Sequence, residues 1–166
     1  VIAVLPQGKP VPDDLADTVA WSHAMHATAL ADQARTKTGA EADRLWTLAG
    51  EKYEAALKVK PDEHDALNNW ANALLSQGEP KSGPEAERLF NQAREKALAA
   101  EEISPGAGSY NVACAFARLG QESNCQEWLE KCKAQDKLPS ADHIRNDPDF
   151  VAVREREWFE KFLASL

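Results

Sequence analysis

Small and apolar residues recur along this chain at intervals of three and four, the spacing of one face of an α-helix. After Pro61, for example, the apolar positions are Leu67, Trp70, Ala71, Leu74 and Leu75. Gly78 follows them, where a helix commonly ends. Because alanine is abundant and β-branched residues are scarce, we expect helices throughout the chain.

The helical pattern occurs twice, with a period of 44 residues. The segment from Lys37 to Pro61 aligns with the segment from Lys81 to Pro105, and 16 of 35 positions are identical when the overlay is extended back to Ala27. Trp46 is matched by Phe90. A fixed period of this length indicates a repeat array, in which each unit buries its apolar face against its neighbours.

Helix boundaries can be predicted within these repeats. Thr38–Glu41 has the spacing of a capping box, and Ser82–Glu85 repeats it, so a second helix is expected to begin at each. Each of these helices should stop before a proline, Pro61 or Pro105, which cannot continue the hydrogen-bond ladder. Asp62 is then expected to cap the next helix.

A third unit follows with a shorter second helix. Residues 110–119 have the same apolar pattern, closed by Gly120, and a partner helix runs through Cys125, Trp128, Leu129 and Cys132. Near the start of the chain, Asp13 and Asp14 suit a helix N-terminus, and that helix extends towards Ala34. The helical hairpin therefore occurs three times.

The second and third units resemble tetratricopeptide repeats (TPR). The matching residues are Ala71 and Ala113, the turn glycines Gly78 and Gly120, the small residues Ala93 and Cys125, and the terminal prolines Pro61 and Pro105. The resemblance covers roughly residues 21–133 and is closest from Ala107 to Lys133. The first two units carry about ten extra residues before or within the second helix, so we expect longer helices or an added loop there.

The resemblance implies an all-α fold, a right-handed superhelical array of three TPR-like helical hairpins with C-terminal capping helices. We expect a single domain, 1–166, with an extended arm at 1–12, repeats at 13–61, 62–105 and 106–136, and the cap at 140–166. A cap is needed because the end of a solenoid must be covered. Asp147-Pro148 is typical of a helix start, and Trp158, Phe159, Phe162 and Leu163 share one helical face.

Charge and hydropathy limit the classes of partner. The net charge is −8 and the isoelectric point is about 5.0, which argues against binding to a nucleic-acid backbone. No apolar run reaches the roughly 18 residues that a membrane span needs, so we expect no membrane insertion. The opening Val1–Leu5 is apolar and lacks Met; a packed arm is favoured, and the tail of a removed signal is the alternative.

The three cysteines indicate a reducing environment. Cys125 and Cys132 are seven residues apart on one helix, roughly 10 Å by helix rise, which is too far for a disulfide. Cys114 occupies a position for a small apolar residue. We expect all three to be buried free thiols in a cytoplasmic protein.

No catalytic or metal motif stands out. His23 and His26 lie three apart on a helix, but no third ligand accompanies them at an obvious spacing, so packing between helices is favoured. The motifs of phosphate-binding loops, serine hydrolases and zinc proteases are absent from the sequence. We therefore expect no enzyme, no cofactor and no metal.

In the TPR family the first helices of successive units line a concave groove that holds a peptide or a partner's helix. The resemblance implies partner-binding residues at Trp21, Asn68, Asn69, Asn72, Tyr110, Asn111 and Arg118, with Ala24, Thr28, Asp65, Ser76 and Cys114 also on this face. Asn69 and Asn111 match a family asparagine that often bonds the ligand's backbone. Asparagine is also common there for reasons of folding, and both interpretations remain open.

The expected function is that of a protein–protein interaction adaptor or scaffold that binds a peptide or helical segment in its groove. Alternatives are the regulatory or scaffolding portion of a larger enzyme or effector, and a small secretion-type chaperone. The family's clamp for an acidic chain terminus requires cations where this chain has Ala24, Asn68, Ala107 and Asn111, so a basic or neutral polar segment is expected. The oligomeric state and occupation of the groove by the last helix stay open.

Overall fold

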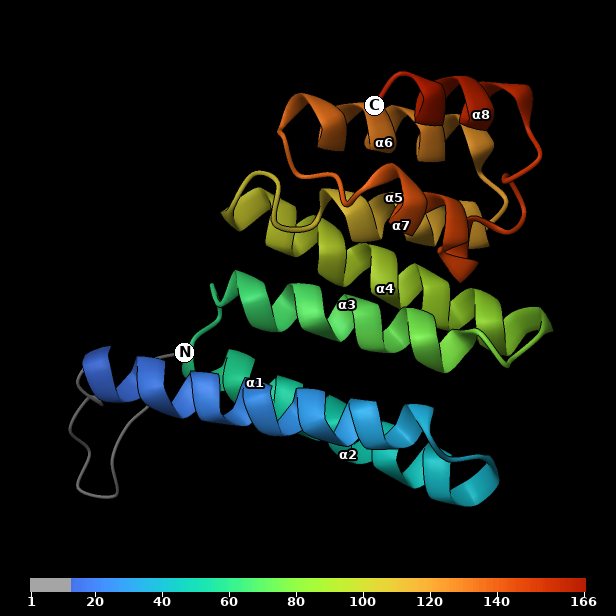
Figure 1. Cartoon of the computed structure of the whole chain (residues 1–166). Helices are drawn as coiled ribbons and strands as arrows, with labels where there is room; N and C mark the ends of the chain where they lie inside the picture. Colours follow the sequence, from blue (N-terminus) through green and yellow to red (C-terminus); the bar gives the residue numbers. More distant parts are fainter. Residues whose placement is uncertain (1–12) are drawn as a thin grey trace.

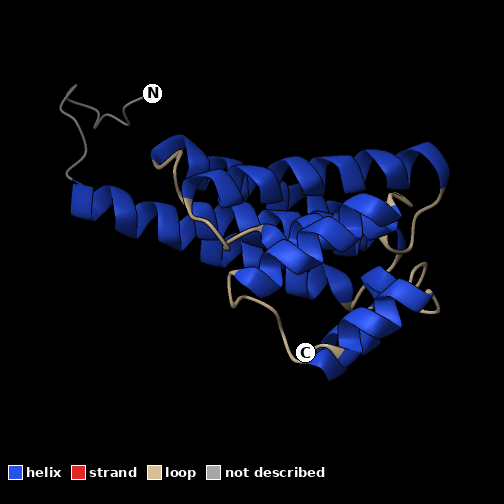
Figure 2. Cartoon of the chain, turned by 90° about the horizontal axis from the view of Figure 1, so that it is seen from above, coloured by secondary structure: helices blue, strands red, loops and turns tan. Residues whose placement is uncertain are grey.

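The computed structural model describes residues 13–166 and contains helices and loops, without a strand, over that range (Figure 2). The all-α prediction is confirmed for these residues, and the extended arm predicted at 1–12 lies outside them. The elements are α1 (Asp13–Arg35), α2 (Gly39–Val59), α3 (His64–Gly78), α4 (Gly83–Ile103), α5 (Ser109–Arg118), α6 (Glu122–Ala134), α7 (Ala141–Asn146), the 3-10 helix η1 (Pro148–Phe150) and α8 (Glu157–Ala164).

The first six helices form three hairpins that stack along one direction (Figure 1). Helix α3 lies against both helices of the first hairpin, and α5 lies against both helices of the second. The first helices α1, α3 and α5 therefore form a row. None of the helices in residues 13–166 is long and apolar enough to cross a membrane.

The extra residues of the first two units lengthen their second helices. Helices α2 and α4 have 21 residues each, whereas α6 has 13. The hairpin turn that precedes α2 spans only residues 36–38. Longer helices are therefore the first of the two expected outcomes.

Small residues allow close approach of the helices within two hydrophobic cores. One core lies in the first hairpin around Trp46 and Tyr53, and the other extends from α3 to the C-terminus. Ala27, Ala56 and many other core positions are alanines with no exposed surface. Trp70 packs against both cores and stacks on Tyr53 with ring centroids 5.8 Å apart, so it joins them.

The predicted starts of α2 and α4 are confirmed, but the capping-box hydrogen bonds are not formed. Thr38 and Ser82 are the N-cap residues, and neither side chain makes a capping bond. In both copies the residue after the N-cap, Gly39 or Gly83, is a glycine at φ +60°. The glutamate of each box pairs with the lysine before the N-cap, at 3.2 Å for Lys37–Glu41 and 3.3 Å for Lys81–Glu85. These ion pairs take the carboxylates that the box requires.

The start of α3 also differs from the prediction by one residue. The backbone N–H of Glu63 donates to the carbonyl of Lys60, which closes a turn around Asp62. Glu63, and not Asp62, is therefore the N-cap of α3.

The C-terminal segment covers the third hairpin. Side chains from η1, α8 and the turn between them are fully buried, among them Phe150, Val153 and Phe159. The 3-10 turn η1 packs on α5. Near α8, Arg156 pairs with Glu122 of α6 at 2.8 Å. This segment is a packed cap.

A buried carboxylate fixes the loop between α4 and α5. Glu101 is 6% exposed and accepts hydrogen bonds from the backbone N–H groups of Gly106 (2.8 Å) and Gly108 (3.3 Å). Gln135 (2.7 Å) and Lys131 (3.0 Å) bind its other oxygen. Burial alone raises its pKa, but the four donors outweigh burial and the pKa is lowered.

Removal of the cap should destabilise the protein. Truncation after Asp142 deletes Phe150 and Phe159 and exposes the core face of α5 and α6. Burial of each aromatic side chain contributes about 2 to 3 kcal/mol. We expect a lower melting temperature or aggregation, measured by circular dichroism and light scattering. Unchanged melting would show that residues 143–166 are a dispensable tail.

Glu101 should make the folding stability dependent on pH. A carboxyl whose pKa is lowered by folding stabilises the protein above its unfolded pKa, near 4.5, and this stabilisation disappears as the pH falls through the folded pKa. Glu101→Gln should therefore lower the urea midpoint at pH 7, and the difference from wild type should shrink under acid. Glu102→Gln, at the exposed neighbour, is the control. A difference that does not change with pH contradicts this role.

Candidate partner-binding face

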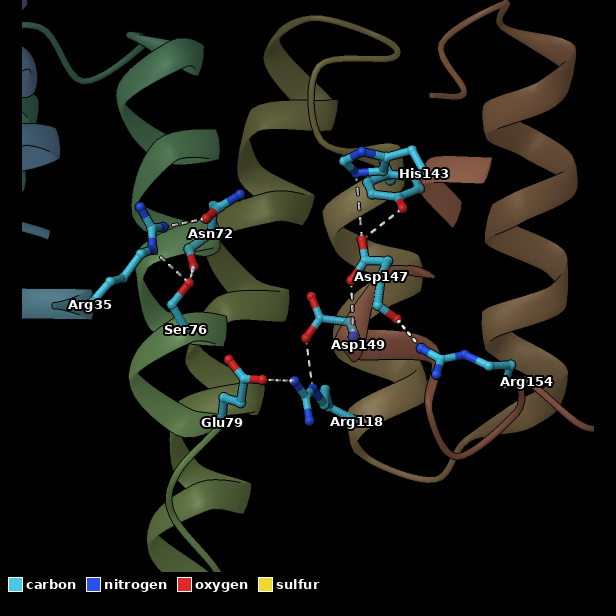
Figure 3. Close-up of polar contacts among 10 residues, drawn as sticks. Arg35, Asn72, Ser76, Glu79, Arg118, His143, Asp147, Asp149 and Arg154 are labelled. Atoms are coloured by element: carbon cyan, nitrogen blue, oxygen red, sulfur yellow. Dashed lines mark hydrogen bonds and ion pairs between the residues drawn. The ribbon is translucent and has the colours of Figure 1, made fainter. Parts of the chain in front are cut away.

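Cross-helix hydrogen bonds link the row of first helices (Figure 3), and we call this series the polar ladder. Its first rung joins α1 to α3. Arg35 donates from Nη2 to Asn72 Oδ1 (2.6 Å) and from Nε to Ser76 Oγ (3.1 Å). The guanidinium also pairs with Asp32 of its own helix. Asn72 and Ser76, both predicted on this face, therefore bind a neighbouring helix.

The second rung joins α3 to α5. Asn111 is 8% exposed and donates from Nδ2 to Oδ1 of Asn68 (2.8 Å) and to its backbone carbonyl (3.2 Å). At the other end of these helices, Arg118 lies 3.6 Å from Glu79. The amide of Asn111 thus satisfies backbone and side-chain groups of the adjacent unit.

The third rung joins α5 to the cap. Tyr110 donates its hydroxyl to Asp147 Oδ2 (2.8 Å), and Arg118 donates from Nε to Asp149 Oδ1 (2.6 Å). Asp147 also accepts the backbone N–H of Asp149 at Oδ1 (2.9 Å), and its carbonyl accepts a bond from Arg154 (3.0 Å). Two residues predicted to bind a partner are engaged here by the chain itself.

Burial sets the protonation states of the third rung. It raises the pKa of the Tyr110 hydroxyl far above its ordinary value, an effect reinforced by the charge of the Asp147 carboxylate. Burial also raises the pKa of the Asp149 carboxyl, and the bond from Arg118 offsets only part of this rise. Tyr110 is therefore a neutral donor at physiological pH.

The local sequence explains why the cap presents two carboxylates to α5. Asp147 precedes a proline and has extended backbone angles, φ −63° and ψ 122°. As predicted, Asp147-Pro148 starts a helix, although it is a single 3-10 turn. Phe150 at its end is fully buried, with its ring 5.8 Å from that of Tyr110. Burial of Phe150 thereby holds Asp147 and Asp149 against α5.

An open cavity of about 350 Å³ lies between α3, α5 and the start of the cap. Its lining includes Asn68, Asn72, Tyr110, Asn111, His143 and Asp147. Cys114 also reaches it but is only 1% exposed. The cavity offers amide donors and acceptors beside carboxylates, which suits a polar ligand.

The predicted binding residues divide into two groups. Asn68, Asn72, Tyr110 and Asn111 meet around the cavity, whereas Trp21, Asn69 and Arg118 are not part of its lining. Trp21 is 62% exposed on α1 and Asn69 is half-buried on α3. Ala24 is buried in the core, and the Thr28 hydroxyl bonds that of Tyr53 (3.1 Å), so this part of α1 serves packing.

Several residues of the ladder were not identified as contacts from the sequence. Arg35, Asp147 and Asp149 act between units, and no repeat position marks them as contacts. One signal was available for Arg35, because the 44-residue overlay aligns it with Glu79, a residue of opposite charge at an equivalent helix end. The acidic pair around Pro148 was interpreted only as a helix start.

The groups of the third rung lie close enough to suggest a metal site. Ligand atoms of Cys114, Asp147 and Asp149 lie within 4.8 Å of one another. However, protein donors bind both oxygens of Asp147, and Arg118 binds Asp149. Burial raises the pKa of the Cys114 thiol well above its ordinary value, so it stays protonated. The cluster therefore holds the cap against α5.

The other candidate groups from the sequence are placed as follows. Cys114, Cys125 and Cys132 are buried and unbonded, as predicted, and burial raises the pKa of each thiol, that of Cys125 to about 12. His23 is half-buried, whereas His26 is exposed. The expectation of packing at His26 is wrong, because its side chain is exposed to solvent.

Comparisons with known proteins return no match: no protein-family model, no curated protein and no solved structure is significantly similar to this chain.

Loss of the Arg118–Asp149 pair should loosen the cap. The two side chains are 14% and 15% exposed, so Asp149→Ala leaves a mostly buried guanidinium with only the longer contact to Glu79. We expect about 2 kcal/mol lower stability in urea unfolding. Asp142→Ala removes a carboxylate that is 90% exposed and pairs with Arg145, and it should change little. If the two substitutions lower the free energy of unfolding equally, the Arg118–Asp149 pair does not hold the cap in place.

Proposed function

We propose that this protein is a non-enzymatic adaptor with a TPR-like superhelical array, which binds an extended segment of a partner protein along the face of α1, α3 and α5. The stacking of three hairpins with their first helices in one row supports this proposal. The observation that carries it is the cavity of about 350 Å³ on that face, lined by Asn68, Asn72 and Asn111. Amide side chains donate and accept at once, which suits a peptide backbone of any sequence.

The cap indicates where on this face a partner has room. Asp147, directly before η1, and Asp149, within η1, already occupy the positions beside Tyr110 and Arg118. A partner segment is therefore expected over α1 and α3, with one end in the cavity. Asn72 is exposed there, and the exposed Trp21 offers an aromatic anchor.

Charge favours a neutral or basic segment. The net charge of the chain is −8, and the cavity is bordered by the carboxylates of Asp147 and Asp149. Lys137 also lines the cavity and Arg118 pairs with Asp149, so the preference rests on the net negative charge of the chain. A partner segment with a lysine or arginine is attracted by this balance, and an acidic segment is repelled.

Peptides selected from an unbiased displayed library of 12-residue segments test this function. Selected peptides should bind wild type with micromolar affinity, measured by fluorescence anisotropy. Because Asn72 and Trp21 are exposed, Asn72→Ala and Trp21→Ala should each weaken binding about tenfold, the loss of about one good contact. Both variants should retain the wild-type circular dichroism spectrum.

Asn124→Ala, at an exposed asparagine on α6, is the matched control and should leave affinity unchanged. The proposed face is wrong if the selected peptides bind the Trp21 and Asn72 variants as well as they bind wild type but no longer bind the Asn124 variant. Failure of the library to give any binder would argue against a peptide-binding function altogether.

A further inference from the structure

A larger cavity, of about 720 Å³, lies between the turn of the first hairpin and the turn of the second. The apolar part of its lining is formed by Ala34, Ala42, Trp46 and Pro80, and Arg35 also lines it. This volume is typical of small-molecule pockets, which range over about 300 to 1,000 Å³ and combine an apolar lining with a few polar groups. The peptide-binding face makes no use of this cavity.

The repeat provides a second copy of this site for comparison. A cavity of about 350 Å³ at the next junction is lined by Gly83, Ala86 and Phe90, the copies of Gly39, Ala42 and Trp46 in the 44-residue overlay. There the guanidinium of Arg118 lies 5.7 Å from the centre of the Phe90 ring. The second copy is therefore partly filled by a side chain of the protein.

The first junction lacks that side chain and reverses the charge beside it. Ser76 takes the place of Arg118 when the turn glycines Gly78 and Gly120 are aligned, and Arg35 takes the place of Glu79 in the 44-residue overlay. At the second junction Glu79 and Arg118 form an ion pair at 3.6 Å. At the first junction Arg35 meets only the short, neutral Ser76 and Asn72 on the facing helix. Its other partner, Asp32 of its own helix, is 62% exposed, so that ion pair is weak and exchangeable. A group that completes the first junction is therefore expected to carry a negative charge.

The other charges around the cavity agree with an anion. Lys37 and Lys81 line it together with Arg35, although Lys81 is already bound by Asp43 and Glu85 (3.1 and 3.3 Å). Of the two acidic residues in the lining, Asp43 is bound by Lys81 at 3.1 Å and Glu79 by Arg118. Lys37 pairs with Glu41, but the two side chains are 44% and 62% exposed, so this pair is weak and exchangeable.

We propose that the cavity between the first two hairpin turns binds a small carboxylic acid with an aromatic or branched aliphatic body. The carboxylate of the ligand pairs with Arg35. This pair corresponds to the Glu79–Arg118 pair of the second junction with the two charges exchanged. The apolar body packs on Trp46, Ala42 and Pro80. This site borders the peptide-binding face at Arg35 and Ser76, but it rests on the cavity and does not depend on the function proposed for that face.

Phenylacetate and phenylacetamide, which differ in charge and not in shape, are the probes. In a nitrogen-15 NMR titration of the whole chain, phenylacetate should shift the amides of Gly39, Ala42 and Ser76 and the indole N–H of Trp46. Phenylacetamide should bind about fivefold more weakly, the value of one partly exposed charge-assisted bond. Arg35→Gln should remove this preference. Equal binding of acid and amide to wild type overturns the proposal.

An internal carboxylate provides a second, independent test. Ser76→Glu places an acid opposite Arg35 and should raise the melting temperature and abolish phenylacetate binding. Ser123→Glu adds the same charge at an exposed position of α6 and should do neither. If Ser76→Glu leaves phenylacetate binding intact, the ligand lies elsewhere and the proposal fails. The blocked dipeptide acetyl-Glu-Phe-amide is a further probe. If it binds more than tenfold more tightly than phenylacetate, the cavity is a site for a partner protein, and the small-molecule assignment is overturned.

Discussion

A helical hairpin cannot bury both of its broad faces by itself, and this constraint determines the arrangement of the described chain. Each hairpin covers the apolar face of the one before it, so α3 packs on α1 and α2, and α5 packs on α3 and α4. Alanines at the contacts, such as Ala27 and Ala71 with no exposed surface, let the helices approach closely. The last hairpin has no successor, and the cap containing Phe150 and Phe159 takes that place.

The same constraint explains why the predicted groove is not simply a free surface. First helices that lie side by side must satisfy the polar groups that face one another across the seam. Asn111 binds Asn68, and Arg35 binds Asn72. These bonds hold successive units in register, and the amides retain further lone pairs and protons for a ligand. Structural and binding roles are therefore compatible at Asn72, which is exposed, and compete at Asn111, which is buried.

The sequence predicts the helices well because their causes are local. Apolar spacing, prolines and glycines determine where α2 and α4 begin and end. It does not predict contacts made between distant segments. The capping box at Thr38 does not form: the next residue, Gly39, has φ +60°, and Glu41 pairs with Lys37 instead. Asp149 reaches Arg118 from 31 positions away, and no local rule connects these two residues. Candidate residues chosen by repeat position could therefore be placed on one face, but their internal partners could not be foreseen.

Differences between the two copies are more informative than their identities. Identical positions such as Ala49 and Ala93 are buried in the core and describe only how a unit packs. The exchange of Glu79 for Arg35 and of Arg118 for Ser76 changes no core residue, so packing does not require it. One junction is consequently partly filled by an internal ion pair over Phe90, while the other retains a larger cavity beside Trp46 that Arg35 also lines. In a repeat protein, a site for a ligand is expected where one copy leaves out the side chain with which another copy fills the same space.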